Sequence, residues 1–555
     1  MLGIGATAMN LKNFALLSAM VIVVNACSPA PETPPLYGVS DLESQRVSGA
    51  EIVAVPGGQS FDQVSARVTL DVDGRVVDAR WTDGGYPRTK PGSRITDAAL
   101  AAVRQWRFRP QSFEGKPIRA VGEVTILLRP AEIPANPAVP FPTAPPEDIE
   151  ISLIRTACFG ICPDYKLTVT GDGRVTYESG ENLLPGTAAE VHRQFNGLNV
   201  LLAGRYEARV SPAAVADLLA RFRAARFFGL KPQYSASITD IPTYVLELRV
   251  GTRRMRVVDY AGGAVGMPAV VTELEDAVDQ LAGSDRWVFG NRETLAALKA
   301  RGFAVRSPAA AALVVALLSL DFWLPAQGDS DGLLRALIAE GLDLDAAVPM
   351  PPEGGRPRPP TTVGAVIASH AARIGNATLF EQMARQGHLA HLGQGELNEL
   401  FQTGMGCSPA IARALVTAGA NPKSMGERGN ALHAIGGAYG ACHERPEQQR
   451  AKMAAALITL GVPVDARNED GETPLMGCND PAMAKLLVAA GANPNAKAGD
   501  GTPVLLSLSD DRAIVTLLRA GANPNVRDRY GTLRQQSPAS NRPATRAWLD
   551  AHGID

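Results

Sequence analysis

The stretches GVPVDARNEDGETPL (461–475), GANPNAKAGDGTPVL (491–505) and GANPNVRDRYGTLRQ (521–535) share one pattern and begin thirty residues apart. Each starts with a glycine. A run of apolar residues at helical spacing precedes the last two of these glycines, in AKLLVAAG and IVTLLRAG. Repetition at a fixed period of about 20–50 residues is typical of folds that stack one structural unit on the next. The period therefore predicts a stacked architecture for the C-terminal half.

These stretches resemble the ankyrin repeat, in which a turn leads into two helices. The positions that carry the resemblance are Thr473, Pro474, Leu475, Gly491, Asn493, Gly521 and Asn523. In such a unit proline starts the first helix, glycine takes the left-handed cap of the second, and asparagine hydrogen-bonds within the turn. The unit after Thr473 is about three residues shorter than the usual ~33, so we expect its first helix to lose a turn. The resemblance implies an array over residues 291–555 that presents a surface to partner proteins.

Three cysteines fall at related places in this half. Cys407 lies twelve residues before Gly419, Cys478 lies thirteen before Gly491, and Cys442 falls in the unit between them. We therefore expect the three to lie along one edge of the stack. In an oxidising compartment this predicts one disulfide between units, either Cys407–Cys442 or Cys442–Cys478. Three part-buried thiols are the alternative.

A fourth and a fifth cysteine, Cys158 and Cys162, lie in RTACFGICPDY (155–165). The pair is compatible with a redox centre, half of a metal site or a disulfide. A metal site needs about four ligands, and between residues 147 and 290 only His192 adds a plausible nitrogen. A thioredoxin-like centre uses C-x-x-C at a helix start, whereas this pair is C-x-x-x-C after an alternating strand. A local disulfide is the favoured interpretation.

Residues 147–290 form one unit by their pattern. Alternating strands are followed by a helix with Ser211 as its N-cap, a hairpin turning at Gly251, and a closing helix. The unit resembles an uncharacterised α+β domain of bacterial secreted proteins and lipoproteins. The marks are the CFGxCPxY opening, TD-x-P at 239–242 and VxDY at 257–260. This resemblance implies a fold and no activity.

Residues 48–128 form an earlier unit. Apolar residues alternate in VTLDVDGRVVDARW (68–81) around a hairpin turn at Asp73-Gly74. With WRFRP (106–110) and GKP (115–117), this pattern resembles the C-terminal domain of TonB-type energy transducers. That resemblance implies a small α+β domain that adds strands edge to edge with outer-membrane transporters. The short tether before it favours a binding module over energy coupling.

The N-terminal segment reads as an export signal. Lys12 precedes a mostly apolar run that is too short to span a bilayer, and we suspect that translation starts at Met9. VNAC (24–27) resembles a lipobox, which implies a signal peptide over 1–26 and a lipid on Cys27. An ordinary secretory signal with a chance cysteine is the alternative. Pro-rich composition predicts a flexible tether over 27–47 and a stiff linker over 129–146.

Composition limits the classes of function. A net charge of −2 gives no argument for a nucleic-acid partner. The chain lacks the usual phosphate-loop, zinc-protease and serine-hydrolase motifs. His388 and His391 are the one metal-like pair, and the repeat pattern explains their position as a helix end. We therefore expect no catalytic residues, no metal and no cofactor.

The sequence thus predicts two small α+β domains followed by an all-α ankyrin-repeat solenoid. The expected function is protein binding by a non-catalytic periplasmic lipoprotein, anchored through its lipid to the outer membrane. One alternative is an accessory of TonB-dependent transport. Another is an enzyme or redox factor that uses Cys158 and Cys162.

Overall fold

The computed structural model describes most of the chain. The residues described are 34–40, 42–49, 52–55, 63–82, 93–160, 162–180, 199–323, 329–348, 361–436, 442 and 445–555. Cys27, the signal segment and most of the predicted tether lie outside them. Among the described residues, no helix combines the length and the apolar character needed to cross a bilayer.

The first folded part is built on a five-stranded sheet in the order β1-β9-β4-β5, with β3 also paired to β9. Its strands are β1 (Leu36–Gly38), β3 (Ile52–Val55), β4 (Gln63–Leu70), β5 (Val76–Thr82) and β9 (Arg119–Pro130). Every second side chain of β4 is buried, as the alternation predicts. Helix α1 (Ser93–Val103) covers the sheet and Trp106 is buried beside it. Two short ribbons complete this part: β2 (Arg46–Ser48) with β6 (Arg107–Phe108), and β7 (Ser112–Phe113) with β8 (Lys116–Pro117).

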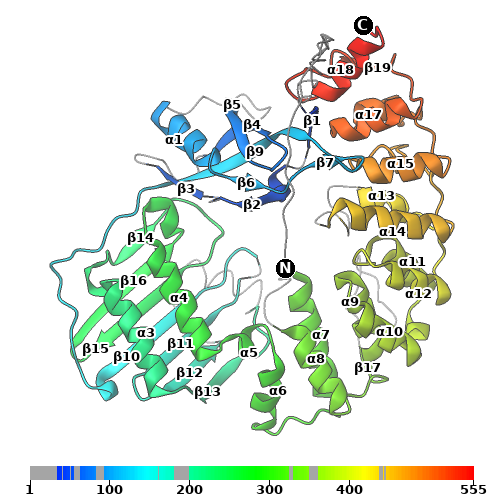
Figure 1. Cartoon of the computed structure of the whole chain (residues 1–555). Coiled ribbons are helices and arrows are strands. Elements are labelled where there is room, and N and C mark those ends of the chain that lie inside the picture. Colours follow the sequence, from blue (N-terminus) through cyan, green and yellow to red (C-terminus); the bar gives the residue numbers. More distant parts are fainter. Residues whose placement is uncertain are drawn as a thin grey trace, which may run out of the picture.

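The second part is a seven-stranded sheet in the order β13-β12-β11-β10-β15-β16-β14. Its strands are β10 (Ile149–Arg155), β11 (Tyr165–Thr170), β12 (Arg174–Ser179), β13 (Gly204–Arg209), β14 (Gln233–Ser235), β15 (Tyr244–Val250) and β16 (Arg253–Tyr260). All pairs are antiparallel except β14 with β16. Helices α3 (Pro212–Ala224) and α4 (Ala269–Ala282) lie side by side across this sheet (Figure 1). Ser211 caps α3 by accepting a hydrogen bond from Ala214 N, as predicted.

The Pro-rich connection between the two sheets is extended and tied down. Ile133 N donates to Gly266 O at 2.7 Å, and Asn136 N donates to Gly229 O at 2.7 Å. Phe141 also packs edge-on against Phe228, with 5.3 Å between the ring centroids. The connection therefore lies along the second part instead of spanning free solvent.

The C-terminal half is an arc of stacked helices (Figure 1). The helices are α6 (Arg292–Lys299), α7 (Pro308–Trp323), α8 (Ser330–Ala339), α9 (Val363–Ile374), α10 (Ala377–Arg385), α11 (Gln394–Thr403), α12 (Pro409–Thr417), α13 (Ala431–Gly436), α14 (Glu447–Thr459), α15 (Pro481–Ala489), α16 (Val504–Ser507), α17 (Asp511–Arg519) and α18 (Pro543–Ala551). Their buried side chains join those of the seven-stranded sheet in one continuous apolar core. The arc and the second sheet therefore share a core.

The expected succession of two small α+β domains and an all-α ankyrin-repeat solenoid is wrong. The chain is a mixed α/β protein whose largest sheet has seven strands. Its C-terminal half also contains strand pairs, β17 (Ala347–Val348) with β18 (Thr361–Thr362) and β19 (Arg527–Asp528) with β20 (Gly531–Thr532).

The short repeat explains part of this difference. Where Thr473, Pro474 and Leu475 predict a first helix, the backbone makes a single turn, with Met476 N donating to Thr473 O at 2.9 Å. The corresponding helix thirty residues later, α16, has four residues. A period of about thirty leaves too few residues for two full helices and a turn.

Candidate functional site

A row of three hydrogen-bonded turns is the main candidate for a binding surface. This turn row consists of residues 467–472, 497–502 and 527–532. Each turn has a glycine at the same place with a positive φ: 72° at Gly471, 87° at Gly501 and 130° at Gly531. Such angles favour glycine over residues with a side chain. The thirty-residue period in sequence is therefore a period in backbone conformation.

Side-chain oxygens close these turns. Asn468 Oδ1 accepts a hydrogen bond from Glu472 N at 2.8 Å, and Asp500 Oδ1 accepts one from Thr502 N at 2.9 Å. In the third turn Asp528 Oδ1 accepts from Tyr530 N at 2.8 Å. Short polar side chains in turns commonly accept hydrogen bonds from nearby backbone N–H groups in this way. Each turn is therefore fixed internally.

Adjacent turns are also fixed to one another. Gly499 N donates to Asp470 O at 2.8 Å, and Arg467 Nη1 donates to Lys497 O at 2.6 Å. A Cβ atom at Gly471 would lie 2.7 Å from Gly499 N, so the two backbones approach too closely for a side chain. The first two turns therefore form one rigid edge.

A ladder at the base of the turns extends this coupling. Asn493 N donates to Asp465 Oδ1 at 3.0 Å, and Asn523 N donates to Asn495 Oδ1 at 2.7 Å. Both bonds join residues that are 28 positions apart. The polar groups of each unit therefore position the backbone of the next.

The predicted repeat-signature residues lie close to this edge. Gly491 and Gly521 follow α15 and α17 with φ of 100° and 90°. Asn493 and Asn523 are exposed, and each side chain accepts a hydrogen bond from the backbone two residues later. Leu475 is fully buried. The asparagines therefore support the turn row, whereas Leu475 belongs to the core.

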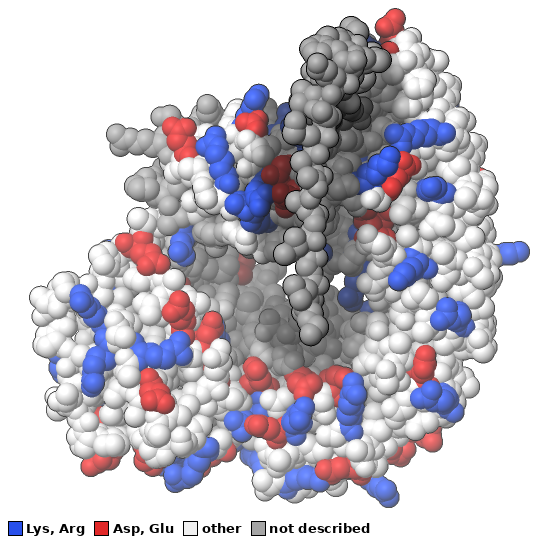
Figure 2. All heavy atoms as spheres, in the orientation of Figure 1, with Lys and Arg blue, Asp and Glu red and all other residues white. Residues whose placement is uncertain are grey.

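The exposed side chains of the turn row are charged, polar or aromatic. Tyr530 is 70% exposed at the tip of the third turn. Glu469, Asp470, Lys497 and Arg529 are also exposed. Figure 2 shows acidic and basic side chains mixed over the visible face of the molecule, without a large area of one sign. A rigid edge of this kind loses little conformational entropy when it binds.

The described part of the chain contains two disulfides, so the prediction of disulfide bonding is confirmed. Cys158 pairs with Cys162, and Cys407 pairs with Cys442 across a Cα–Cα distance of 5.0 Å. Cys478 remains a buried thiol whose Sγ donates to Asp480 O at 3.4 Å. Burial raises the pKa of this thiol to about 12, which leaves it un-ionised at neutral pH.

The loop of the first disulfide is held from several sides. Asn199 Nδ2 donates to Gly160 O at 3.1 Å, and Thr156 Oγ1 accepts from Thr243 N at 2.8 Å. The loop follows β10 and does not start a helix, in contrast to a thioredoxin-like centre. Phe159 in this loop is 69% exposed. Phe159 therefore exposes an aromatic ring next to Gly160, whose carbonyl oxygen accepts a hydrogen bond from Asn199.

The residues that flank this loop take part in a part-buried ionic network that no sequence motif indicated. Arg155 Nε donates to Asp279 Oδ2 at 2.8 Å, and Tyr165 Oη donates to Asp279 Oδ1 at 2.8 Å. The Arg155 guanidinium also stacks over the ring of Tyr244, 4.4 Å from its centroid. Burial works against the Arg155 charge, but Asp279 outweighs it and raises the arginine pKa. Arg155 is the first residue of RTACFGICPDY and Tyr165 is the last, so both ends of this motif contact Asp279.

Glu275 is a buried acidic residue in the same region. Its side chain is fully buried, and within the described part of the chain neither carboxyl oxygen has a hydrogen-bond partner. Burial, and next the nearby Asp259 carboxyl, raise the pKa of Glu275 to about 8. The group is therefore mainly protonated at neutral pH. Its spacing of four residues from Asp279 on one predicted helix face was the available sequence signal.

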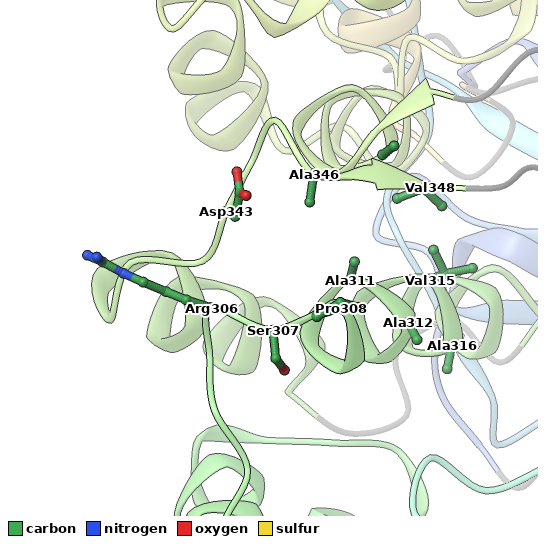
Figure 3. Close-up of a pocket in the computed structure, with 11 residues that line it drawn as sticks. Arg306, Ser307, Pro308, Ala311, Ala312, Val315, Ala316, Asp343, Ala346 and Val348 are labelled. Carbon is green, nitrogen blue, oxygen red and sulfur yellow. The ribbon is translucent and has the colours of Figure 1, made fainter.

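Two further features bear on a ligand or metal site. A cavity of about 680 Å³ lies between α7 and the segment that leads into β17, with Ala311, Val315, Ala346 and Val348 among its lining residues (Figure 3). Of the two predicted histidines, His388 is buried with Nδ1 3.5 Å from Asp345 Oδ1, and His391 is exposed. Across the described ranges, no group of three or more His, Cys, Asp or Glu side chains is placed to hold a metal ion.

The ends of the second sheet region coincide with a match to a known family. Residues 149–282 match a family described as a domain of unknown function (DUF6438), and this range runs from the first residue of β10 to the last of α4. No curated protein matches the chain. The chain therefore contains a segment similar to DUF6438 that comprises the seven-stranded sheet and the two helices across it.

Proposed function

We propose that this protein is a non-catalytic binding protein that holds partner proteins through its C-terminal half and its first domain. The turn row is the observation that carries the proposal. Its turns are fixed by hydrogen bonds within and between units, while charged, polar and aromatic side chains project from them. Exposed groups on a pre-ordered backbone are suited to protein recognition.

The proposed location is the periplasm, with a lipid on Cys27 that anchors the protein to the outer membrane. Two disulfides in one chain support an oxidising compartment, because cytosolic thiols are kept reduced. The resemblance of VNAC (24–27) to a lipobox supports the anchor.

A second candidate function is an accessory role in TonB-dependent transport. Its support is the resemblance of residues 48–128 together with the position of β5 at an edge of the first sheet. Val77 on this strand is 56% exposed. An edge strand is able to accept an added strand from a partner.

Site-specific photo-crosslinking in intact cells tests both candidates. A photoreactive residue at Lys497 or Arg529 is expected to give adducts with a specific protein. The same residue at Arg209, an exposed arginine on β13, serves as the matched control. Absence of adducts from both turn-row positions would refute binding through this edge. Adducts of Val77 with outer-membrane transporters would support the second candidate.

A further inference from the structure

The first and last parts of the chain meet through a separate small interface. Strand β1 lies against α17 and α18, which brings residues near the two ends of the described chain together (Figure 1). The buried side chains at the contact are Tyr37, Phe113, Ile118 and Val515, and they form a cluster distinct from both larger cores. The polypeptide is therefore closed on itself.

Asp511 is the polar centre of this interface. Its side chain is fully buried, and its Oδ2 accepts a hydrogen bond from Gly38 N of β1 at 3.0 Å. The same carboxyl group accepts from Ala544 N at 2.8 Å and from Thr545 N at 2.7 Å. One carboxylate therefore links β1, α17 and the first turn of α18.

The β7–β8 hairpin supplies a second contact. Its tip residues have positive φ, 51° at Glu114 and 75° at Gly115, as in a two-residue hairpin turn. A residue other than Gly, Asn or Asp is uncommon at such an angle. Here the angle accompanies an ion pair in which Arg519 Nη1 donates to Glu114 Oε2 at 3.0 Å. The Arg519 guanidinium also lies 5.4 Å from the centroid of the Phe113 ring.

The geometry points to a releasable latch. The protein alternates between a closed form, in which β1 covers α17 and α18, and an open form, in which this end of the helical arc is exposed. The interface buries few apolar side chains, and its ion pair is half exposed, at 45% and 53% of the two side chains. Relative motion is the ordinary expectation for interfaces within one chain unless they are large and apolar. The latch does not depend on the proposed function, although a partner that binds this end of the arc would bind the open form and not the closed one.

Gly38 allows the latch to be opened selectively. Its φ is not positive, so alanine is compatible with its backbone. A Cβ atom there would lie 2.0 Å from Asn541 O and 3.1 Å from Asp511 Cβ, both of which belong to the opposite side of the interface. Gly38→Ala therefore acts as a wedge in the contact. Gly395→Ala in α11 is the matched control, because nothing lies within 4 Å of its Cβ position.

Hydrogen–deuterium exchange on the full chain tests the latch. In the unmodified protein, β1, the β7–β8 hairpin and α18 are expected to exchange faster than β4 and β10, by an opening separate from global unfolding. Gly38→Ala should raise the exchange rate of the interface at least tenfold and leave the rates of β4 and β10 unchanged. The control variant Gly395→Ala should exchange at the interface as the original protein does. Exchange of the interface only together with the two cores, or an unchanged rate in Gly38→Ala, would overturn the proposal.

Charge-reversal variants of the ion pair provide a second test that does not rely on Gly38→Ala. Glu114→Arg and Arg519→Glu each place like charges together and should each raise exchange at the interface several-fold. The double variant E114R/R519E restores an opposite pair and should return the exchange toward the original rate. Single variants without effect, or a double variant as open as the singles, would contradict the latch.

Discussion

The seven-stranded sheet and the turn row hold their polar groups in opposite ways. In the sheet region the network of Arg155 is largely buried and pairs residues over long separations, as Arg155 does with Asp279, 124 residues away. In the turn row the groups are mostly exposed, and each contact between units joins residues about thirty apart. The first arrangement depends on a few strong contacts, and the second on many equivalent weak ones. Disruption of single contacts should therefore affect the two regions very differently.

The largest effect is expected from Arg155→Met. Removal of the guanidinium leaves Asp279, whose side chain is only 17% exposed, with its hydrogen bond from Tyr165 but without a cationic partner. Breaking a buried pair in this way costs about 3–5 kcal/mol. Urea denaturation should show this loss in the stability of the second sheet. Arg209→Ala, at an arginine that is 74% exposed, is the control and should change stability little.

Loss of the Cys407–Cys442 disulfide should rank next. The bond closes a loop with a separation of 35 residues. In the chain-entropy account its removal in the double serine variant costs about 4 kcal/mol. Urea denaturation of the variant and the original protein under non-reducing conditions measures the difference. Under a reducing agent the two should unfold alike, and a difference that persists would mean that the serines themselves are destabilising.

Glu275 gives the sheet region a dependence on pH that extends into the neutral range. Its pKa rises from 4.5 to about 8 on folding, so the folded state binds more protons between these values. The free energy of unfolding should therefore fall as the pH rises through this window, with a slope of at most about 1.4 kcal/mol per pH unit. Glu275→Gln should remove most of this slope and be more stable than the original protein above pH 8.

The neighbouring carboxyl groups define the control for that experiment. Burial also raises the pKa of Asp259, so a smaller slope of the same sign should remain in Glu275→Gln. Glu273 lies on the same helix and is exposed, so Glu273→Gln should keep the full slope. Equal slopes in Glu275→Gln and the original protein would show that Glu275 does not retain a proton in the fold.

The Cys158–Cys162 disulfide should contribute less than the longer bridge. It joins residues that are four positions apart. In the chain-entropy model, a loop of this size corresponds to a stabilisation of about 2 kcal/mol. The double serine variant is expected to fold, to lose about that much stability in urea, and to show no redox phenotype. Loss of a thiol-dependent activity in cells without loss of folding would favour the redox alternative over the structural role.

The contrast between long-range contacts in the sheet region and repeated contacts in the turn row also explains which features could be predicted from the sequence. The glycines of the repeat predict left-handed backbone at Gly491 and Gly521, because that requirement is local and recurs. The sequence predicts that the helix starting near Thr473 is one turn short, but in the structure only a single turn remains there. The contact of Gly38 with Asp511 spans 473 positions and has no local mark in the sequence. The ionic network was missed for the same reason, although both ends of RTACFGICPDY take part in it.

The smallest effect should come from one rung of the ladder below the turn row. Asn495 Oδ1 accepts a hydrogen bond from Asn523 N, so Asn495→Ala leaves an exposed donor to water and should cost about 1 kcal/mol or less. Asn525, thirty residues later, is exposed and only its backbone takes part in a described hydrogen bond. Asn525→Ala should therefore be neutral. Faster hydrogen exchange around residue 523 in Asn495→Ala, and not in Asn525→Ala, would show that each unit positions the next. Equal exchange in both variants would mean that the helices alone set the register of the turns.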